Sequence, residues 1–463
     1  MRLAGPTRSH VCEADVMSDA HEPSTERPGS ALRFRDFRLF ALAMLLSTIA
    51  MQMASVAIGW QVYALTGSAL SLGYVGLAQF APAILLSFAT GQASDRFERR
   101  RVLVVCHSLL ALSALGLLLL VQVTTLHRVG FIYGLLVLVG AARAFQAPAS
   151  QSLTPNLVPD THFPSAVAWT SSIWQISVVS GPALGGVLFA VGGGKLVYGT
   201  TMALELVSVG VLLCLRVTTT RKRAKISVSE FVAGWRFVRY QPVILGALSL
   251  DLCAVLLGGA VALLPIYARD LLHVGPQGLG LLRSAPAVGA LLVALALAYR
   301  PIERRSGTIM LSCVAVFGVA TVVFGVSRHF LLSLGALAIA GAADMGSVYI
   351  RHALVQLNTP DGMRGRVAAI NMMFIGASNE LGEFESGMLA AMLGVVPAVV
   401  IGGLGSCAVV AIWAVLFPAL RRADRLSLST TARAERASRS PTGEEPSEPD
   451  ARLALALEPR ESA

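Results

Sequence analysis

Long apolar runs, separated by short polar segments, form the dominant pattern along this chain. A helix needs about 20 apolar residues to cross the hydrocarbon core of a bilayer. A run inside that core must be helical, because the backbone there has no water with which to bond. The pattern therefore predicts an all-α membrane protein with twelve transmembrane helices. The predicted spans are 39–65, 72–94, 102–124, 129–149, 166–191, 196–216, 242–268, 277–299, 308–326, 330–354, 367–393 and 396–418.

The first six spans and the last six resemble each other in sequence. The string Gln151-Ser-Leu-Thr-Pro155 returns 205 positions later as Gln356-Leu-Asn-Thr-Pro360. Gly76 aligns with Gly280, 204 positions later, within a second matching string. Agreement at nearly one offset indicates a duplicated six-helix unit, so we expect two pseudo-symmetric halves.

Polar segments set the limits of the predicted domains. The two terminal segments are expected to be disordered cytoplasmic tails, and the first lacks the apolar core of a signal peptide. The central linker alternates basic and apolar residues at helical spacing. We expect it to lie on the anionic inner leaflet as an amphipathic helix; a site for a calmodulin-like partner is the weaker alternative. The predicted domains are an N-terminal tail (1–32), an N-terminal six-helix bundle (33–217), a basic linker (218–241), a C-terminal six-helix bundle (242–422) and a C-terminal tail (423–463).

Composition and charge agree with this class of protein. Only 14% of the residues are charged, against about 25% in soluble domains. The net charge of +10 comes mainly from loops on one side of the predicted membrane. The positive-inside rule places those loops and both termini in the cytoplasm, so the charge does not indicate nucleic-acid binding. The six cysteines form no CxxC or Cys/His cluster, and we expect no disulfide, metal or cofactor. No phosphate-binding loop or nucleophile–base pair indicates an enzyme or an ATP-driven pump.

A basic loop joins the second and third spans, with the sequence Gly91-Gln-Ala-Ser-Asp95-Arg96-Phe-Glu-Arg99-Arg100-Arg101. Gly91 permits close helix packing, and Asp95 can accept hydrogen bonds from the amino end of a facing helix. Gly91, Asp95, Arg96 and Arg100 are therefore our candidates for a contact with a facing helix. The alternative is that the arginines only anchor the loop in the cytoplasm, which leaves Asp95 unexplained.

The fifth span contains the string Gly181-Pro182-Ala-Leu-Gly185-Gly186. Proline removes a helix hydrogen bond, and glycines let two helices approach closely. We therefore expect a flexible helix whose packing changes when one half moves against the other. A simple proline kink is the alternative.

Several acidic residues lie inside predicted spans, where a charge costs at least about 2.5–3.5 kcal/mol. Glu380 and Glu383 share one face of the eleventh span, because they are three positions apart, whereas Glu385 points elsewhere. Two close carboxylates at low dielectric can hold a proton near neutrality. Glu380, Glu383 and Asp251 are therefore our proton-coupling candidates. Arg283 lies at a depth similar to that of Glu383 and Glu385, and a structural ion pair with Arg283 is an equally weighted alternative.

Five strings of the second half carry a family resemblance. They are Gly258-Gly-Ala-Val-Ala-Leu-Leu-Pro265-Ile-Tyr-Ala, Gly280-Leu-Leu-Arg283-Ser-Ala-Pro286, Arg351-His-Ala-Leu-Val-Gln356, Met363-Arg-Gly-Arg366-Val and Leu381-Gly-Glu383-Phe-Glu385-Ser-Gly387. With the two motifs above, they resemble the bacterial transmembrane secretion effector group of the major facilitator superfamily. The resemblance implies alternating access, proton antiport, and a central cavity lined by spans one, four, seven and ten. It also implies that Gly91, Asp95, Arg96 and Arg100 form a conformational latch against the eleventh span near Arg366.

On that architecture, polar residues of the four lining spans are the cavity candidates, although each could instead face a neighbouring helix. They are Gln52, Gln61 (or Trp60), Arg143, Asp251 and Asp344. Glu205 is a further acid inside a span. Arg143 and Arg351 sit nearer the cytoplasm and can snorkel to the surface.

These observations predict a secondary active exporter of a small organic molecule, siderophore- or drug-like, driven by proton antiport. Its expected partners are that substrate, protons and the lipid bilayer. We expect a monomer in the bacterial inner membrane. A nutrient importer or facilitator is one alternative, and a membrane scaffold or sensor without transport is another.

Overall fold

The computed structural model describes residues 30–122, 127–216, 228–302 and 304–423. These residues form helices and no β-strand, which confirms the predicted all-α class. The helices of the first half are η1 (Ser30–Arg33), α1 (Arg35–Thr66), α2 (Ala69–Arg96), α3 (Arg99–Leu120), α4 (Arg128–Leu153), η2 (Thr154–Asn156), η3 (Asp160–His162) and α5 (Phe163–Leu213). Those of the second half are α6 (Val228–Tyr240), α7 (Pro242–Leu257), η4 (Ala260–Leu263), α8 (Leu264–Ile266), η5 (Tyr267–Leu271), α9 (Gly275–Tyr299), α10 (Ser306–Val326), α11 (Phe330–Leu357), η6 (Asp361–Met363), α12 (Arg364–Leu393), α13 (Val395–Leu416) and α14 (Pro418–Arg421).

Helix α5 runs through two predicted spans without a loop between them. Gly193, with φ of 63° and ψ of −162°, interrupts its helical backbone, and glycine suits this region because it lacks a β-carbon. Gly193 therefore divides α5 into two arms. Within the described residues, nine helical stretches are long and apolar enough to cross a membrane. This count takes α5 as one stretch and leaves out α2 and α12. Counting the second arm of α5 and these two helices as well makes the described helices consistent with the twelve predicted spans.

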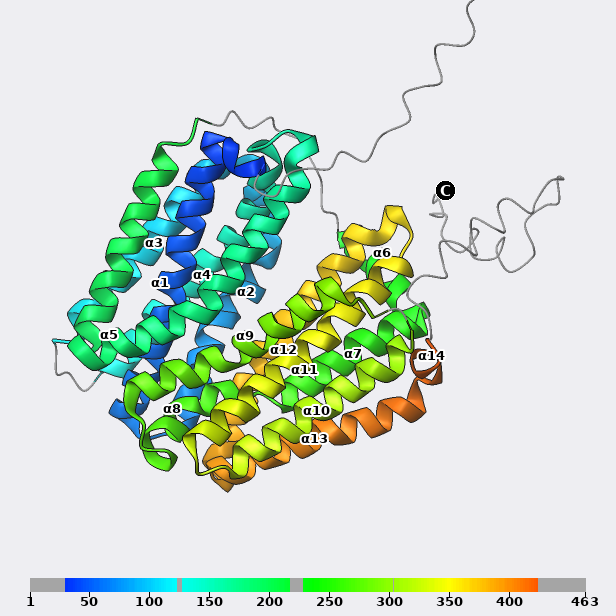
Figure 1. Ribbon diagram of the computed structural model, residues 1–463. Coiled ribbons are helices and arrows are strands. Elements are labelled where there is room, and N and C mark those ends of the chain that lie inside the picture. Colours follow the sequence, from blue (N-terminus) through cyan, green and yellow to red (C-terminus); the bar gives the residue numbers. More distant parts are fainter. Residues whose placement is uncertain (1–29, 123–126, 217–227, 303, 424–463) are drawn as a thin grey trace, which may run out of the picture.

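The helices gather into two bundles (Figure 1). Helices α1 to α5 pack on one another in the first bundle, and α7 to α13 do so in the second. Two main crossings join the bundles, where α5 packs against α9 and α2 packs against α12, and α1 makes smaller contacts with α8 and α9. The bundles therefore meet along a few helices, which is the arrangement that a rocking motion between two halves requires.

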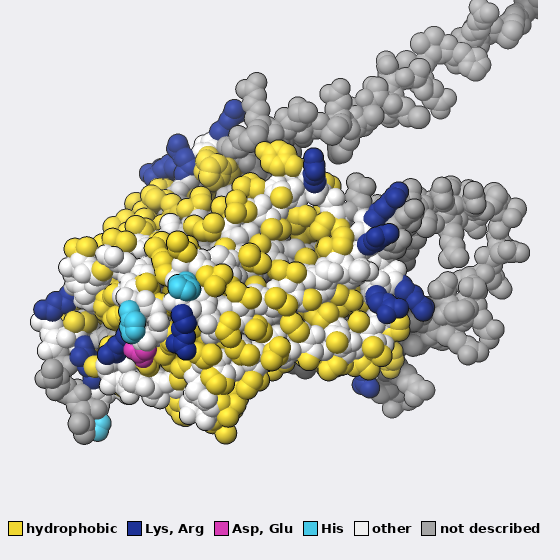
Figure 2. Space-filling view, turned by 60° about the horizontal axis from the view of Figure 1, so that its bottom comes forward, with side chains coloured by type: hydrophobic (Ala, Val, Ile, Leu, Met, Phe, Trp, Pro, Cys, Tyr) yellow, Lys and Arg dark blue, Asp and Glu magenta, His cyan; other side chains and the backbone are white. Residues whose placement is uncertain are grey.

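The outer surface of the bundles is apolar. Figure 2 shows hydrophobic side chains over most of one face, with the described Lys and Arg side chains toward its edges. Leu85, Leu331 and Val415 are among the most exposed, at 79%, 78% and 77%. An apolar surface of this extent needs a nonaqueous neighbour, and lipid supplies it.

The described part of the linker forms helix α6, which packs against α12 and α7. Val238 is fully buried in a cluster with Val367 and Ile370 of α12. The ring of Trp235 lies 6.0 Å from that of Phe374. Contacts with the second bundle therefore hold α6 in place, in addition to any contact with the leaflet. Residues 217–227, which include the first part of the linker, lie outside the described residues, as do the two tails up to residue 29 and from 424.

Candidate functional site

A cavity of about 310 Å³ lies between the two bundles. Helices α1 to α5 form one side of its wall, and residues from η4, α8, α9 and α12 form the other. Apolar side chains make up most of the wall, as is usual for small-molecule sites. Its charged and amide side chains are Gln52, Gln79, Arg143, Glu205, Arg283, Glu380 and Glu383.

Four of these residues form a charged quartet, which we define as Arg143, Arg283, Glu380 and Glu383. The two glutamates lie one turn apart on α12, and the arginines come from α4 and α9. Both guanidinium charges act on both carboxylates; Arg283 acts more strongly on Glu383, and Arg143 on Glu380. Each bundle therefore places positive charge near the same pair of acids.

Helix α2 supports the quartet from one side. Arg143 donates a hydrogen bond from Nη1 to Oε1 of Gln79 at 3.2 Å. A β-carbon at Gly76 would lie 2.9 Å from Oε2 of Glu383, so glycine makes room for this carboxylate. Sequence reasoning did not select Gln79. Its signal is an amide in an otherwise apolar stretch of the second span.

The other cavity candidates are divided between the cavity and the helix interfaces. Gln52 lines the cavity. Gln61 is buried outside the lining, where its Oε1 accepts a hydrogen bond from the hydroxyl of Tyr198 at 2.6 Å. The rotation of α1 about its axis decides this difference, and a uniformly apolar helix gives little indication of that rotation.

Asp251 and Asp344 belong to a second polar cluster, away from the cavity lining. Asp251 accepts a hydrogen bond from Nη1 of Arg351, and the two residues are only 5% and 2% exposed. Asp344 lies within electrostatic range of both. Arg351 therefore does not snorkel to the surface as the sequence suggested, because its charge is neutralised inside the second bundle.

Glu385 is not part of the cavity wall, whereas Arg283 and Glu383 are. Three latch candidates lie at the carboxyl end of α2, and Arg100 lies in the first turn of α3. The backbone of Gly91, Asp95 and Arg96 is helical, but their side chains lie outside the described part of the structure. Arg100 donates hydrogen bonds to the carbonyl oxygens of Leu212 and Leu213, at 3.2 and 2.7 Å.

The glycines of the 181–186 string are contact points between helices. A β-carbon at Gly185 would lie 2.8 Å from the backbone of Met53 in α1. A β-carbon at Gly186 would lie 2.5 Å from the carbonyl oxygen of Pro276 in α9, and one at Gly280 would lie 2.5 Å from that of Pro182. The string therefore brings the backbones of the two bundles into direct contact.

We expect Gly186→Ala to separate α5 from α9 and to lower transport by about tenfold or more. The added methyl meets backbone, which cannot rotate away, and overpacking costs about 1–3 kcal/mol. Initial transport rates in vesicles would measure the effect. Gly199→Ala is the matched control, because a β-carbon at Gly199 of the same helix meets nothing within 4 Å. Equal rates for both variants would contradict the proposed role of the α5–α9 contact.

A polar contact joins the bundles at the end of α1. The hydroxyl of Tyr63 donates a hydrogen bond to Asp270 of η5. The guanidinium of Arg269 lies 5.6 Å from the centre of the Tyr63 ring. Gly73 of α2 packs against Gly387 of α12 at a neighbouring crossing. These contacts close the space between the bundles at this end.

Within the described residues, no group of three or more His, Cys, Asp or Glu side chains could hold a metal ion. The site therefore consists of a cavity, a charged quartet and the crossings that join the bundles. Such an arrangement can bind a small molecule and a proton, and can change shape when the bundles move.

Known proteins with similar sequences are transporters. The family model described as transmembrane secretion effector matches residues 27–439. The enterobactin exporter EntS of Citrobacter koseri is 26% identical over 396 residues, which cover 83% of this chain and 92% of the exporter. The multidrug efflux pump Tap of Mycolicibacterium fortuitum is 28% identical over 352 residues, which cover 72% of this chain and 84% of the pump.

Solved structures with a similar fold are also transporters. The nucleoside transporter NupG has a TM-score of 0.63 at 14% identity and covers 83% of this chain and 99% of its own. A bacterial homologue of the iron transporter ferroportin, in its inward-facing state, has a TM-score of 0.63 at 17% identity, covering 84% and 99%. At these identities the likeness concerns the fold alone.

Proposed function

The chain belongs to the transmembrane secretion effector family of the major facilitator superfamily, and on this premise we propose that it is a proton-driven exporter. Its substrate would be a small organic molecule, siderophore- or drug-like, carried by alternating access across the bacterial inner membrane. The similarity to an enterobactin exporter and to a multidrug efflux pump supports export. The single observation that carries the proposal is the charged quartet in a cavity between two bundles.

The orientation that we propose follows from the loops. The positive-inside rule assigns the basic ends of the helices, and with them both termini, to the cytoplasm. The end that holds Tyr63 and Asp270 would then face outward, and the cavity would be reached from the cytoplasm. Contacts at one end of the bundles support an inward-facing state.

We propose that export proceeds by competition at the quartet. Substrate enters from the cytoplasm or inner leaflet while Glu380 and Glu383 are ionised. After the bundles rock, a proton from outside binds one of these carboxylates and substrate leaves. Protonation neutralises that carboxylate and so lowers the free-energy cost of closing the largely apolar cavity around it. The bundles then return to the inward-facing state and release the proton inside.

Mass spectrometry of a deletion strain and its complemented twin tests the export proposal. Culture medium and cell extract would be compared with and without iron. We expect a compound that is lost from the medium and accumulates in the deletion strain, and iron dependence would indicate a siderophore. A compound taken up from the medium only by complemented cells would select the importer. No difference, together with ligand binding but no vesicle transport, would select the scaffold or sensor.

Tyr63→Phe is expected to weaken the closure at the proposed outer end. The change removes a hydrogen bond to a charged group, which contributes about 1.5–3 kcal/mol, so outward-open molecules should increase at least about tenfold. The measurement is the rate at which a charged thiol reagent, added from outside, labels a cysteine introduced in the cavity as Gln52→Cys. Labelling of the same protein with Gln52 intact gives the background. Tyr299→Phe, at a tyrosine that is 86% exposed, is the control. Unchanged labelling would refute the role of the Tyr63 contact.

A further inference from the structure

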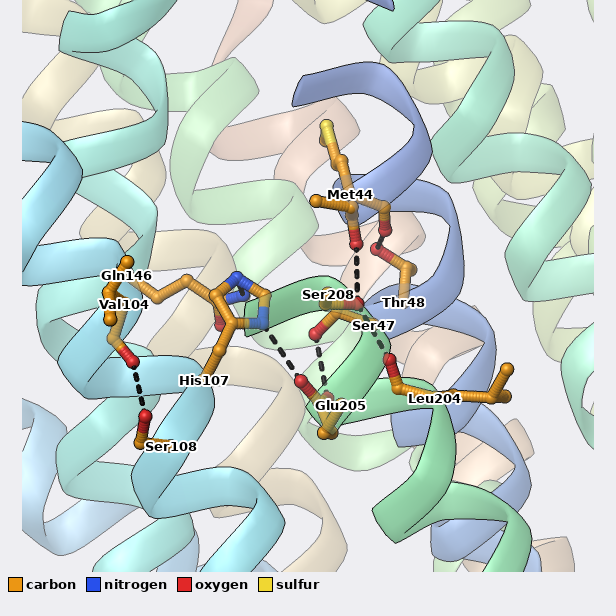
Figure 3. A network of polar contacts seen from close by, with 11 residues as sticks. Met44, Ser47, Thr48, Val104, His107, Ser108, Gln146, Leu204, Glu205 and Ser208 are labelled. Atoms are coloured by element: carbon orange, nitrogen blue, oxygen red, sulfur yellow. Dashed lines mark hydrogen bonds and ion pairs between the residues drawn. The ribbon is translucent and has the colours of Figure 1, made fainter. Parts of the chain in front are cut away.

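A buried polar network lies beside the cavity in the first bundle (Figure 3). His107 of α3 and Glu205 of α5 are 3% and 2% exposed. Nδ1 of His107 lies 2.8 Å from Oε2 of Glu205, and the hydroxyl of Ser47 donates to Oε1 at 2.7 Å. The side-chain nitrogen of Gln146 lies 3.3 Å from Nε2 of His107. Both ring nitrogens and both carboxylate oxygens therefore have a partner.

This network can satisfy two protonation states of the histidine. With a neutral ring, Nδ1–H of His107 donates to Glu205, and Nε2 accepts from the amide nitrogen of Gln146. When a proton occupies Nε2, rotation of the Gln146 amide presents its oxygen as an acceptor. Neither state leaves a buried polar atom without a partner, so the cost of an unmade hydrogen bond is avoided in both.

Binding of a proton changes the charge of this part of the cavity. The charged quartet sums to zero when all its members are ionised. Glu205, which also lines the cavity, then leaves the wall with a net charge of −1, and a proton on His107 brings the sum to zero. The other charged groups on the cavity wall are Arg143 on α4, Arg283 on α9, and Glu380 and Glu383 on α12. Cys106 neighbours His107 on α3, and α1 contributes the hydroxyl groups of Ser47 and Thr48.

The two residues that hold the His107–Glu205 pair have charged counterparts in the second bundle. Ser47 and Gln146 correspond to Asp251 and Arg351 at the repeat offsets of 204 and 205. Asp251 and Arg351 form the buried ion pair described above. Arginine stays protonated, whereas histidine exchanges its proton near physiological pH. The second bundle therefore has a fixed ion pair at the two positions whose first-bundle equivalents, Ser47 and Gln146, contact the His107–Glu205 pair.

We propose that the His107–Glu205 pair is a second proton-binding site, distinct from Glu380 and Glu383 on the opposite wall. This inference rests on the proposed proton exchange and deepens it. The pair takes one proton from cavity water, the proton resides on the imidazole, and Glu205 remains the carboxylate. The proton returns to the cavity when the wall becomes more positive, either because the substrate brings a cationic group or because one of the glutamates is neutralised.

Histidine-labelled full-length protein in lipid nanodiscs tests this site by NMR between pH 5 and 8. The His107 signals would be assigned with His107→Gln. We expect them to change from imidazolium to neutral ring as pH rises. In Glu205→Gln the ring should stay neutral throughout, because the counter-charge is gone. The exposed His127 is the internal control, and its signals should be the same in both proteins.

A single protonation state of His107 across this range, or the same titration in Glu205→Gln, would overturn the proposal. Gln146→Leu is the second variant if Glu205→Gln does not fold. It removes the acceptor for Nε2–H, so proton affinity should fall about tenfold; unchanged affinity would also overturn the proposal. The titration needs no transport, so the two ideas fail separately. If the protein transports substrate but His107 does not titrate, only the second proton site is refuted. If the pair titrates but the protein moves no substrate, the site stands and the exporter proposal is refuted.

Discussion

Export against a proton gradient is expected to fall about 100-fold when Glu383 is replaced by glutamine. Glutamine keeps the shape of the side chain but cannot exchange a proton. A charge in the membrane interior costs at least about 2.5–3.5 kcal/mol. In the variant, protonation can no longer remove this cost during the transport cycle. A free energy of that size corresponds to roughly 100-fold in an equilibrium constant. The variant should remain folded, because the two arginines retain Glu380 as a partner.

Everted vesicles would measure this effect as substrate uptake driven by an imposed pH gradient. Residual transport in Glu383→Gln should no longer depend on pH, whereas substrate exchange without a gradient should continue. Glu385→Gln is the matched control, since Glu385 lies two residues away on α12 and does not line the cavity. An unchanged pH dependence in Glu383→Gln would refute its coupling role.

Arg351→Met is expected to destabilise the protein by about 3–5 kcal/mol, because it leaves the buried carboxylate of Asp251 without its partner. Asp344 makes this worse, since it adds a second acid within electrostatic range. Thermal unfolding of the purified protein in detergent would show a lower Tm. The double variant Arg351→Met/Asp251→Leu should regain most of the lost stability, because replacing both members of a buried ion pair with apolar groups is often neutral for the free energy of unfolding.

Arg101→Met provides the control for this change. Arg101 is bound to Glu98 at 2.8 Å, but its side chain is 82% exposed, so its loss should matter little. A Tm of Arg351→Met equal to that of Arg101→Met would show that the pair does not stabilise the second bundle. A double variant less stable than Arg351→Met alone would contradict the idea that unpaired charge is the cause.

Much of the fold could be predicted from apolar runs, because in a membrane each run must form a helix. The shared face of Glu380 and Glu383 also follows from local geometry, since residues three apart on a helix are neighbours. The depth of Arg283 could be counted along its span. The structure places these three residues on one cavity wall.

The other polar contacts depend on how helices rotate against one another, which local sequence does not determine. Asp251 and Arg351 are 100 positions apart, and His107 and Glu205 are 98 apart. Each pair forms because two particular helix faces meet. The string 181–186 predicted close packing, but the partners of its glycines, α1 and α9, became evident only in three dimensions.

Different turns of helix α5 line the cavity and pack against neighbouring helices. Trp174 and Val178 line the cavity, while Gly185 and Gly186, farther along, touch neighbouring backbones. On the proposed mechanism, substrate choice and motion would therefore depend on different residues of one helix. If the proposal holds, descendants of this chain would acquire new substrates through changes at Trp174 or Val178 without disturbing the contacts between the bundles. Such a division would allow one transport machine to diversify into relatives that carry chemically unrelated compounds.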